Sequence, residues 1–142
     1  MNIRDYKKIL FYVMFPLFLG GLVGILNING FNNYDGILSG WIFPVVWTIL
    51  YILMGYSSYL ISGNKRLFSI YIINLIVNLL WTFIFFMFDF KVFAFFWILF
   101  LIIIVSIMIY EFYRVDKLSG YLLIPYILWL LFAAILNLIE II

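Results

Sequence analysis

The stretch VFAFFWILFLIIIVSIMIY (Val92–Tyr110) decides the fold class, because it carries no charged side chain over a length that suits a membrane crossing. A helix needs roughly 20 apolar residues to cross the roughly 30 Å hydrocarbon core of a bilayer. A strand of a membrane barrel would instead alternate apolar and polar residues. The stretch is continuously apolar, and it therefore predicts a transmembrane helix.

Four further uncharged runs of the same kind cover residues 9–28, 42–61, 67–88 and 118–139. The composition agrees, since 69% of the 142 residues are hydrophobic and only 10% are charged, whereas globular domains are about half apolar and a quarter charged. The links between the runs are short, so successive helices should be antiparallel neighbours. We therefore expect an all-α membrane protein in which residues 1–142 form a single bundle of five transmembrane helices.

The basic residues predict the orientation of this bundle. Five crossings put seven of the eight Lys and Arg side chains on one face of the membrane: Arg4, Lys7, Lys8, Lys65, Arg66, Arg114 and Lys117. Lys91 alone falls on the other face. Because loops rich in Lys and Arg stay in the cytoplasm, we expect a cytoplasmic N-terminus. The loop 29–40 and the C-terminus should then lie outside.

Three of the runs carry aromatic and polar side chains on a single helical face. In the second run Trp47 and Tyr51 are four residues apart, with Trp41 at the membrane edge. In the third run Asn78 and Trp81 share a face. The fifth run adds a stripe of Trp129, Phe132, Ala133 and Asn137. These stripes either hydrogen-bond between helices or face one another around a cavity, which would suit a large flat apolar ligand.

The chain lacks the residue types that several kinds of chemistry require. The chain has no His and no Cys, which excludes metal ligation by imidazole or thiolate and a histidine-based triad. No Asp, Glu, Lys or Arg lies inside the five runs, so groups for acid–base catalysis or ion coupling are scarce. A net charge of +2 does not indicate nucleic-acid binding. We expect no metal, no required cofactor and no acid–base enzyme.

Three segments resemble the TspO/MBR family, which comprises tryptophan-rich sensory proteins and translocator proteins. They are GWIFPVVWTILYILMGYSSYL (Gly40–Leu60), NLLWTFIFF (Asn78–Phe86) and VDKLSGYLLIPYILWLLFAAILN (Val115–Asn137). The segments stand in the family's order, and the resemblance extends over nearly the whole chain.

The resemblance implies a five-helix bundle, often a homodimer, with an internal pocket that opens toward the first extramembrane loop. It implies porphyrin or haem as ligands, and sterols or other apolar small molecules in some members. Carried over by motif position, the pocket residues are Trp41, Trp47, Tyr51, Asn78, Trp81, Trp129, Phe132, Ala133 and Asn137.

Three departures from the family pattern stand out. The loop YDGILSGW (Tyr34–Trp41) lacks the family's prolines, which predicts a shorter or more mobile lid. Phe83 replaces a proline that often follows the third-helix Trp, which predicts a straighter helix. No Tyr or Arg follows Asn137, so the sterol-associated pattern expected there is absent.

Three functions remain open at this level. The first is tetrapyrrole binding with a sensing, regulatory or transport role. The second is light- and oxygen-dependent porphyrin degradation, in which Trp47 and Trp129 would steer photochemistry of the porphyrin itself. The third is a structural membrane protein that binds lipid incidentally.

Overall fold

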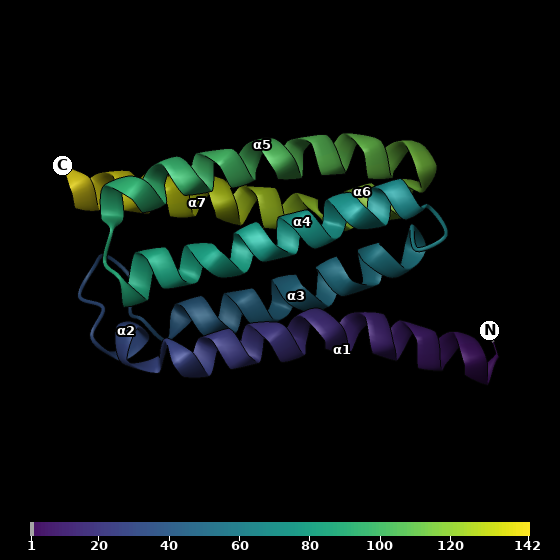
Figure 1. Ribbon diagram of the computed structural model, residues 1–142, viewed down its shortest axis with the longest axis horizontal. Helices are drawn as coiled ribbons and strands as arrows, with labels where there is room; N and C mark the ends of the chain where they lie inside the picture. Colours follow the sequence, from purple (N-terminus) through teal and green to yellow (C-terminus); the bar gives the residue numbers. More distant parts are fainter. Residues whose placement is uncertain (1) are drawn as a thin grey trace.

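The computed structural model describes residues 2–142, which contain helices and no strand. Five long helical segments form a bundle, with their axes running roughly along its length (Figure 1). They are α1 (Ile3–Leu26), α3 (Ile42–Leu60), α4 (Lys65–Thr82), α5 (Lys91–Val115) and α7 (Ile124–Ile141). The shorter elements are α2 (Ile28–Asn32), the π-helical turn η1 (Phe83–Met87) and α6 (Lys117–Leu122). Counting η1 with α4 and α6 with α7, all five segments are long and apolar enough to cross a membrane, which confirms the predicted fold class.

The first helix begins earlier than its uncharged run. Asn2 caps it by accepting a hydrogen bond from the Asp5 backbone N–H at 3.1 Å, and the Asp5 carboxylate accepts one from the Asn2 N–H at 3.3 Å. This reciprocal capping box stabilises the first turn. Arg4, Lys7 and Lys8 therefore lie on α1 rather than before it. The fourth segment likewise extends past the apolar run to Val115.

The fifth segment is interrupted just before Pro125. Proline cannot donate a backbone hydrogen bond within a helix, but it is accommodated in a first turn. Here α6 ends at Leu122, and α7 begins at Ile124 with Pro125 in its first turn. The α6 side is fixed to α3 by two buried hydroxyls: Ser57 Oγ donates to the Ser119 carbonyl at 2.9 Å, and Ser119 Oγ donates to the Ser57 carbonyl at 3.0 Å.

The third segment does not continue as a regular helix after Trp81, contrary to the expectation from Phe83. The α-helical pattern ends at Thr82, and Phe83–Met87 form a π-helical turn. Its hydrogen bond runs from the Phe88 N–H to the Phe83 carbonyl, at 2.9 Å. The wider turn brings Phe85 and Phe86 into the interior, where both are buried. π-Helical turns of this kind frequently occur at functional sites.

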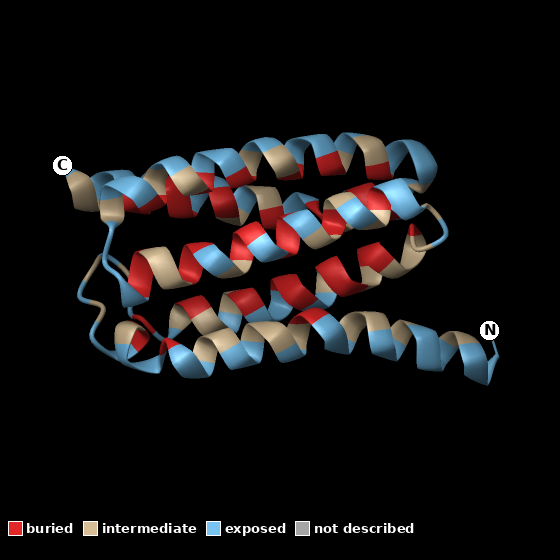
Figure 2. Cartoon of the chain, viewed as in Figure 1, coloured by how far each residue is buried: buried red, intermediate tan, exposed pale blue. Residues whose placement is uncertain are grey.

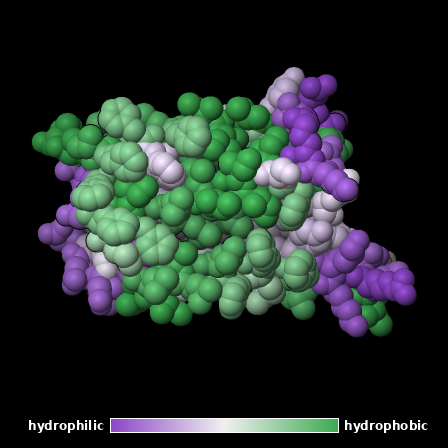
Figure 3. Space-filling model, viewed as in Figure 1, coloured by the Kyte–Doolittle hydropathy of each residue, from purple (hydrophilic) through white to green (hydrophobic). Residues whose placement is uncertain are grey.

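Burial and hydropathy agree with a membrane setting. Buried residues face one another on α3, α4 and α7, whereas α1 is largely exposed along its length (Figure 2). A broad hydrophobic belt separates hydrophilic atoms at the two ends of the bundle (Figure 3). The helix directions put the seven basic residues named above at the end that carries the N-terminus, and Lys91 at the other.

Glycines allow α1 and α3 to approach closely. A Cβ on Gly55 of α3 would lie 2.6 Å from both the carbonyl oxygen of Tyr12 and the Cα of Val13 on α1. Gly20 of α1 faces the Tyr51 ring of α3 so closely that a Cβ there would overlap the ring. Gly20 and Gly55 thus lie at the contact between α1 and α3. Small residues at helix contacts are a general device of membrane bundles.

We predict that Gly55→Ala destabilises the bundle, because the added methyl meets backbone atoms that cannot rotate away. Overpacking of this kind costs about 1–3 kcal/mol, which should lower the thermal transition of the purified protein in detergent by several degrees. Gly21→Ala is the matched control, since nothing lies within 4 Å of a Cβ at that position. Equal transition temperatures for the two variants would contradict the proposed contact.

Candidate functional site

Aromatic rings from α3 and α7 meet in the middle of the bundle. Trp47 and Tyr51, one turn apart on α3, stack with ring centroids 5.7 Å apart. The Trp47 ring also contacts two rings of α7 edge-on, Tyr126 at 6.1 Å and Trp129 at 6.4 Å. Edge-to-face and offset contacts are the favoured arrangements of aromatic pairs. The predicted stripes of these two helices therefore do face each other.

A chain of hydrogen bonds joins the same helices to α4. The Tyr51 hydroxyl donates to Asn78 Oδ1 at 2.6 Å, and Asn78 Nδ2 donates to the Tyr126 hydroxyl at 2.8 Å. The Tyr126 hydroxyl in turn donates to Asn74 Oδ1 at 2.8 Å. All four side chains are buried. Each donor is paired in a region where lipid offers no alternative, so this chain fixes α3, α4 and α7 relative to one another.

Further aromatic rings lie nearer the end of the bundle that carries the first loop. Trp81 stacks on Phe85 with centroids 4.8 Å apart. Phe86 contacts Phe43 of α3 at 5.1 Å, and Phe43 contacts Trp129 at 6.0 Å. These rings fill the space between α3, η1 and α7. We use the name aromatic layer for the rings of Phe43, Trp47, Trp81, Phe85, Phe86 and Trp129.

Three polar atoms next to this layer have no hydrogen-bond partner within residues 2–142. They are Trp81 Nε1, Trp129 Nε1 and Asn137 Oδ1, and all three are buried. The other amide atom of Asn137 is paired, since its Nδ2 donates to the Lys91 carbonyl at 2.8 Å. A buried polar group left unpaired costs about 1–3 kcal/mol. Two indole donors and one amide acceptor therefore lie unpaired in the interior of the bundle.

The structure brings most of the predicted site residues together and separates two of them. The buried ones are Trp47, Tyr51, Asn78, Trp81, Ala133 and Asn137, and Trp129 is partly buried beside them. Trp41 is 67% exposed at the start of α3, and Phe132 is 40% exposed on the outer side of α7. Phe132 and Trp129 line a shallow groove between α3 and α7.

A cavity lies at the end of the bundle that carries the first loop, and we call it the loop-end cavity. Its volume is about 780 Å³. Its wall is formed by Leu26, Asn27, Asn29, Gly30, Asn33, Tyr34, Asp35, Gly36, Phe86, Met87, Asp89, Lys91 and Glu140. Phe86 belongs to both this wall and the aromatic layer. A smaller cavity of about 240 Å³ between α1 and α3 borders Trp47 and Tyr51.

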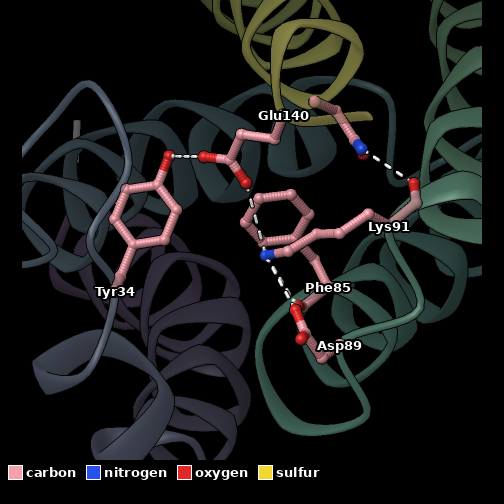
Figure 4. Close-up of polar contacts among 6 residues, drawn as sticks. Tyr34, Phe85, Asp89, Lys91 and Glu140 are labelled. Carbon is pink, nitrogen blue, oxygen red and sulfur yellow. Dashed lines mark hydrogen bonds and ion pairs between the residues drawn. The ribbon is translucent and has the colours of Figure 1, made fainter. Parts of the chain in front are cut away.

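Charged side chains converge at the inner edge of the loop-end cavity (Figure 4). Lys91 Nζ lies 3.4 Å from Glu140 Oε2 and 3.3 Å from Asp89 Oδ1. The same ammonium sits over the Phe85 ring, 3.5 Å from its centroid. The Tyr34 hydroxyl donates to Glu140 Oε1, which connects the first loop to the end of α7. Burial, together with this carboxylate, raises the pKa of Tyr34 well above its ordinary value.

Sequence reasoning missed the residues of this cluster, Tyr34, Asp89, Lys91 and Glu140, and the ring of Tyr126. Weak signals existed for three of them. Glu140 lies three residues after Asn137 and so falls on the same helical face. Lys91 is the one cation assigned to its side of the membrane. Tyr126 follows the conspicuous Pro125. No local pattern points to Tyr34, because its contacts come from the far end of the chain.

Comparison with known proteins agrees with this architecture. A sequence model of the TspO/MBR family matches residues 12–139. A tryptophan-rich sensory protein of Cereibacter sphaeroides is 30% identical over 100 residues, which cover 68% of this chain and 63% of the relative. The protein CrtK of Rhodobacter capsulatus is 35% identical over 104 residues, which cover 68% and 65%. The tryptophan-rich protein TspO of Chlorobaculum tepidum is 35% identical over 104 residues, which cover 68% and 66%.

The match thus spans slightly less than two thirds of the length of these curated relatives. The family model nevertheless covers nearly the whole of this chain, including all three segments on which the resemblance rests. The five membrane-crossing segments point the same way. The chain is a multi-pass membrane protein and belongs to the TspO/MBR family.

Proposed function

We propose that the protein binds flat apolar ligands inside the membrane, with tetrapyrroles such as porphyrin or haem as the leading class, and that binding serves a sensing, regulatory or transport role. The name of one relative, tryptophan-rich sensory protein, supports a sensory role in particular. The aromatic layer of this chain supports the ligand class.

The single observation that carries the proposal is the set of unpaired polar atoms beside stacked rings. Trp81 Nε1 and Trp129 Nε1 are donors without acceptors, and Asn137 Oδ1 is an acceptor without a donor, within residues 2–142. A flat ring system with hydrogen-bonding substituents on its periphery would satisfy these groups. Its faces would stack on the surrounding aromatic rings. Ordinary helix packing gives no reason to leave both indole donors unpaired, since each costs free energy.

Entry of such a ligand from the loop-end cavity would require Phe86 to move, together with Tyr34. Phe86 lines the cavity and contacts Phe43 and Trp81 of the aromatic layer, and the Tyr34 ring of the same wall contacts Phe43 and Phe86. Phe86 is carried by the π-helical turn η1, where the backbone pattern already departs from a regular helix. The loop-end cavity has the volume of typical ligand sites, which are about 300–1,000 Å³. A ligand that starts in this cavity would reach the indoles by displacing Phe86 and Tyr34.

We predict that Trp81→Phe and Trp129→Phe each weaken binding of protoporphyrin IX about fivefold, because each removes one hydrogen-bond donor worth about 1 kcal/mol while keeping an aromatic ring. The measurement is a titration of purified protein in detergent, in the dark, followed by the absorbance of the porphyrin. Trp97→Phe is the matched control, since Trp97 Nε1 already donates to the Val77 carbonyl at 2.8 Å, between α5 and α4.

Unchanged affinity in both pocket variants would contradict the assignment of the two indoles. Failure of the unaltered protein to bind the porphyrin saturably would remove the proposed function itself. Repeating the titration under light and oxygen separates binding from breakdown: loss of porphyrin absorbance well beyond one equivalent, dependent on the pocket tryptophans, would assign degradation instead.

We further propose that the N-terminus is cytoplasmic and that the first loop lies outside. Support comes from the basic residues, seven of which lie at the end of the bundle that carries the N-terminus. A strong bias of Lys and Arg toward one side orients membrane proteins.

This orientation predicts opposite labelling of two engineered thiols, and the chain suits the test because it contains no Cys. In intact cells a membrane-impermeant maleimide should label Asp35→Cys in the first loop and leave Lys7→Cys unlabelled. Both variants should react after the membrane is permeabilised, which controls for accessibility. Labelling of Lys7→Cys alone in intact cells would reverse the orientation.

A further inference from the structure

A narrow apolar groove lies between α1 and α4, near the end of the bundle that carries seven of the eight basic residues, which we call the basic end. In the groove the ring of Tyr12 on α1 meets that of Phe68 on α4 edge-on, with centroids 5.8 Å apart. The other lining residues are Phe11, Phe15, Ser58, Tyr71 and Ile72. Phe11 and Phe15 are 66% and 39% exposed, so the groove opens on the outer surface of the bundle.

The size of the groove limits what it can hold. Its volume is about 180 Å³, whereas sites for whole drug-sized molecules are about 300–1,000 Å³. A porphyrin therefore does not fit. A segment of one hydrocarbon chain does, and its apolar surface matches the aromatic and aliphatic walls.

Each of the two helices that wall the groove carries a lysine just beyond it. Lys8 lies four residues before Tyr12, and Lys65 lies three residues before Phe68, so each lysine shares a helical face with the ring that it precedes. Both helices start at the basic end and run in the same direction (Figure 1). At 1.5 Å of rise per residue, the lysines are displaced from the two rings by about 6 Å and about 4.5 Å toward that end. They therefore lie on the same side of the groove.

This position corresponds to the boundary of the hydrocarbon core. The uncharged runs of the two helices begin at Ile9 and Leu67, directly after Lys8 and within two residues of Lys65. Side chains on a helix tilt toward its N-terminus, and a lysine near a helix end extends its ammonium into the headgroup region. We therefore expect both ammonium groups at the level of the lipid headgroups, with the groove directly below them in the hydrocarbon.

No side chain of the described residues neutralises these two lysines. Both are exposed, and neither forms an ion pair within residues 2–142. The acidic side chains of the basic end are already engaged, two in helix caps and one in an ion pair with Arg66: they are Asp5, Asp116 and Glu111. Two unpaired cations beside an apolar groove match an amphiphile with an anionic head and a hydrocarbon tail.

We propose that the groove between α1 and α4 binds one acyl chain of an anionic phospholipid from the leaflet at the basic end, and that Lys8 and Lys65 pair with its phosphate. The lysines alone would attract any anion, and the groove alone would accept any hydrocarbon chain. An anionic phospholipid is the occupant that uses both features. The site lies at the opposite end of the bundle from the loop-end cavity, so this inference does not depend on the proposed function.

The test compares two phospholipids that have the same acyl chains and differ in headgroup charge. They are dimyristoyl phosphatidylglycerol, which is anionic, and dimyristoyl phosphatidylcholine, which is zwitterionic. Delipidated protein in a non-ionic detergent is titrated with each lipid at low ionic strength, and the first bound lipid is quantified by native mass spectrometry. We expect phosphatidylglycerol to bind at least about tenfold more tightly, because each basic side chain near an anionic headgroup favours binding. Added salt should reduce this preference.

Charge-neutralising variants test the headgroup contact. Lys8→Gln and Lys65→Gln should each reduce the preference for phosphatidylglycerol about fivefold, with little change in the affinity for phosphatidylcholine. Lys117→Gln is the matched control, because it removes the same charge from an exposed residue at the same end of the bundle, on α6 and outside the groove.

A second pair of variants tests the acyl-chain contact. Ile72→Trp enlarges a side chain that lines the groove, and it should weaken the binding of both lipids several-fold while leaving their ratio unchanged. Ile73→Trp is the matched control, since Ile73 is 53% exposed on the same helix and does not line the groove.

Three results would overturn the inference. Equal affinities of the unaltered protein for the two phospholipids would remove the charge recognition. Equal effects of Lys8→Gln, Lys65→Gln and Lys117→Gln would show a diffuse attraction to the whole basic end rather than a site. Equal affinities of Ile72→Trp and Ile73→Trp would exclude the groove as the place where the acyl chain binds.

Discussion

The hydrogen bonds that run from Tyr51 through Asn78 and Tyr126 to Asn74 are the interaction on which the rest of the bundle depends. Hydrocarbon offers no partner to a polar side chain, so these four groups must find one another. They come from α3, α4 and α7. Their pairing therefore fixes the rotation of each of these helices about its axis and their positions relative to one another along the bundle. The aromatic layer is continuous with this chain of hydrogen bonds, because the Trp47 ring contacts Tyr51 and Tyr126 and also Trp129.

The two ends of the bundle differ in how they are closed. At the basic end the Ser57 and Ser119 hydroxyls join α3 to α6 with every donor paired, and Arg66 and Glu111 form an ion pair at 2.8 Å. At the other end the helix after Trp81 widens into η1, and the chain after α1 continues into the short α2 and an irregular loop. The packing there leaves the loop-end cavity, which Phe86 lines. Ligand access thus belongs to the end at which the backbone is least regular.

Within the candidate site, the residues predicted from motifs and those found by contact differ for a physical reason. Helical periodicity shows which side chains share a face, and it correctly grouped Trp47 with Tyr51 and Asn78 with Trp81. It cannot show how far a helix is rotated toward lipid, so Phe132 falls in the predicted stripe although it is 40% exposed. Trp41 was assigned to the pocket by motif position, and it is 67% exposed.

The sequence by itself determined the number of crossings, because a bilayer of fixed thickness requires apolar runs of fixed length. It also marked α3, α4 and α7 as the helices with a polar and aromatic face. Only the tertiary structure decided the charged cluster at the loop end, since Tyr34, Lys91 and Glu140 are distant in the chain and meet through the fold. The structure likewise decided which indole and amide atoms stay unpaired, because that depends on neighbours in space and not on spacing along a helix.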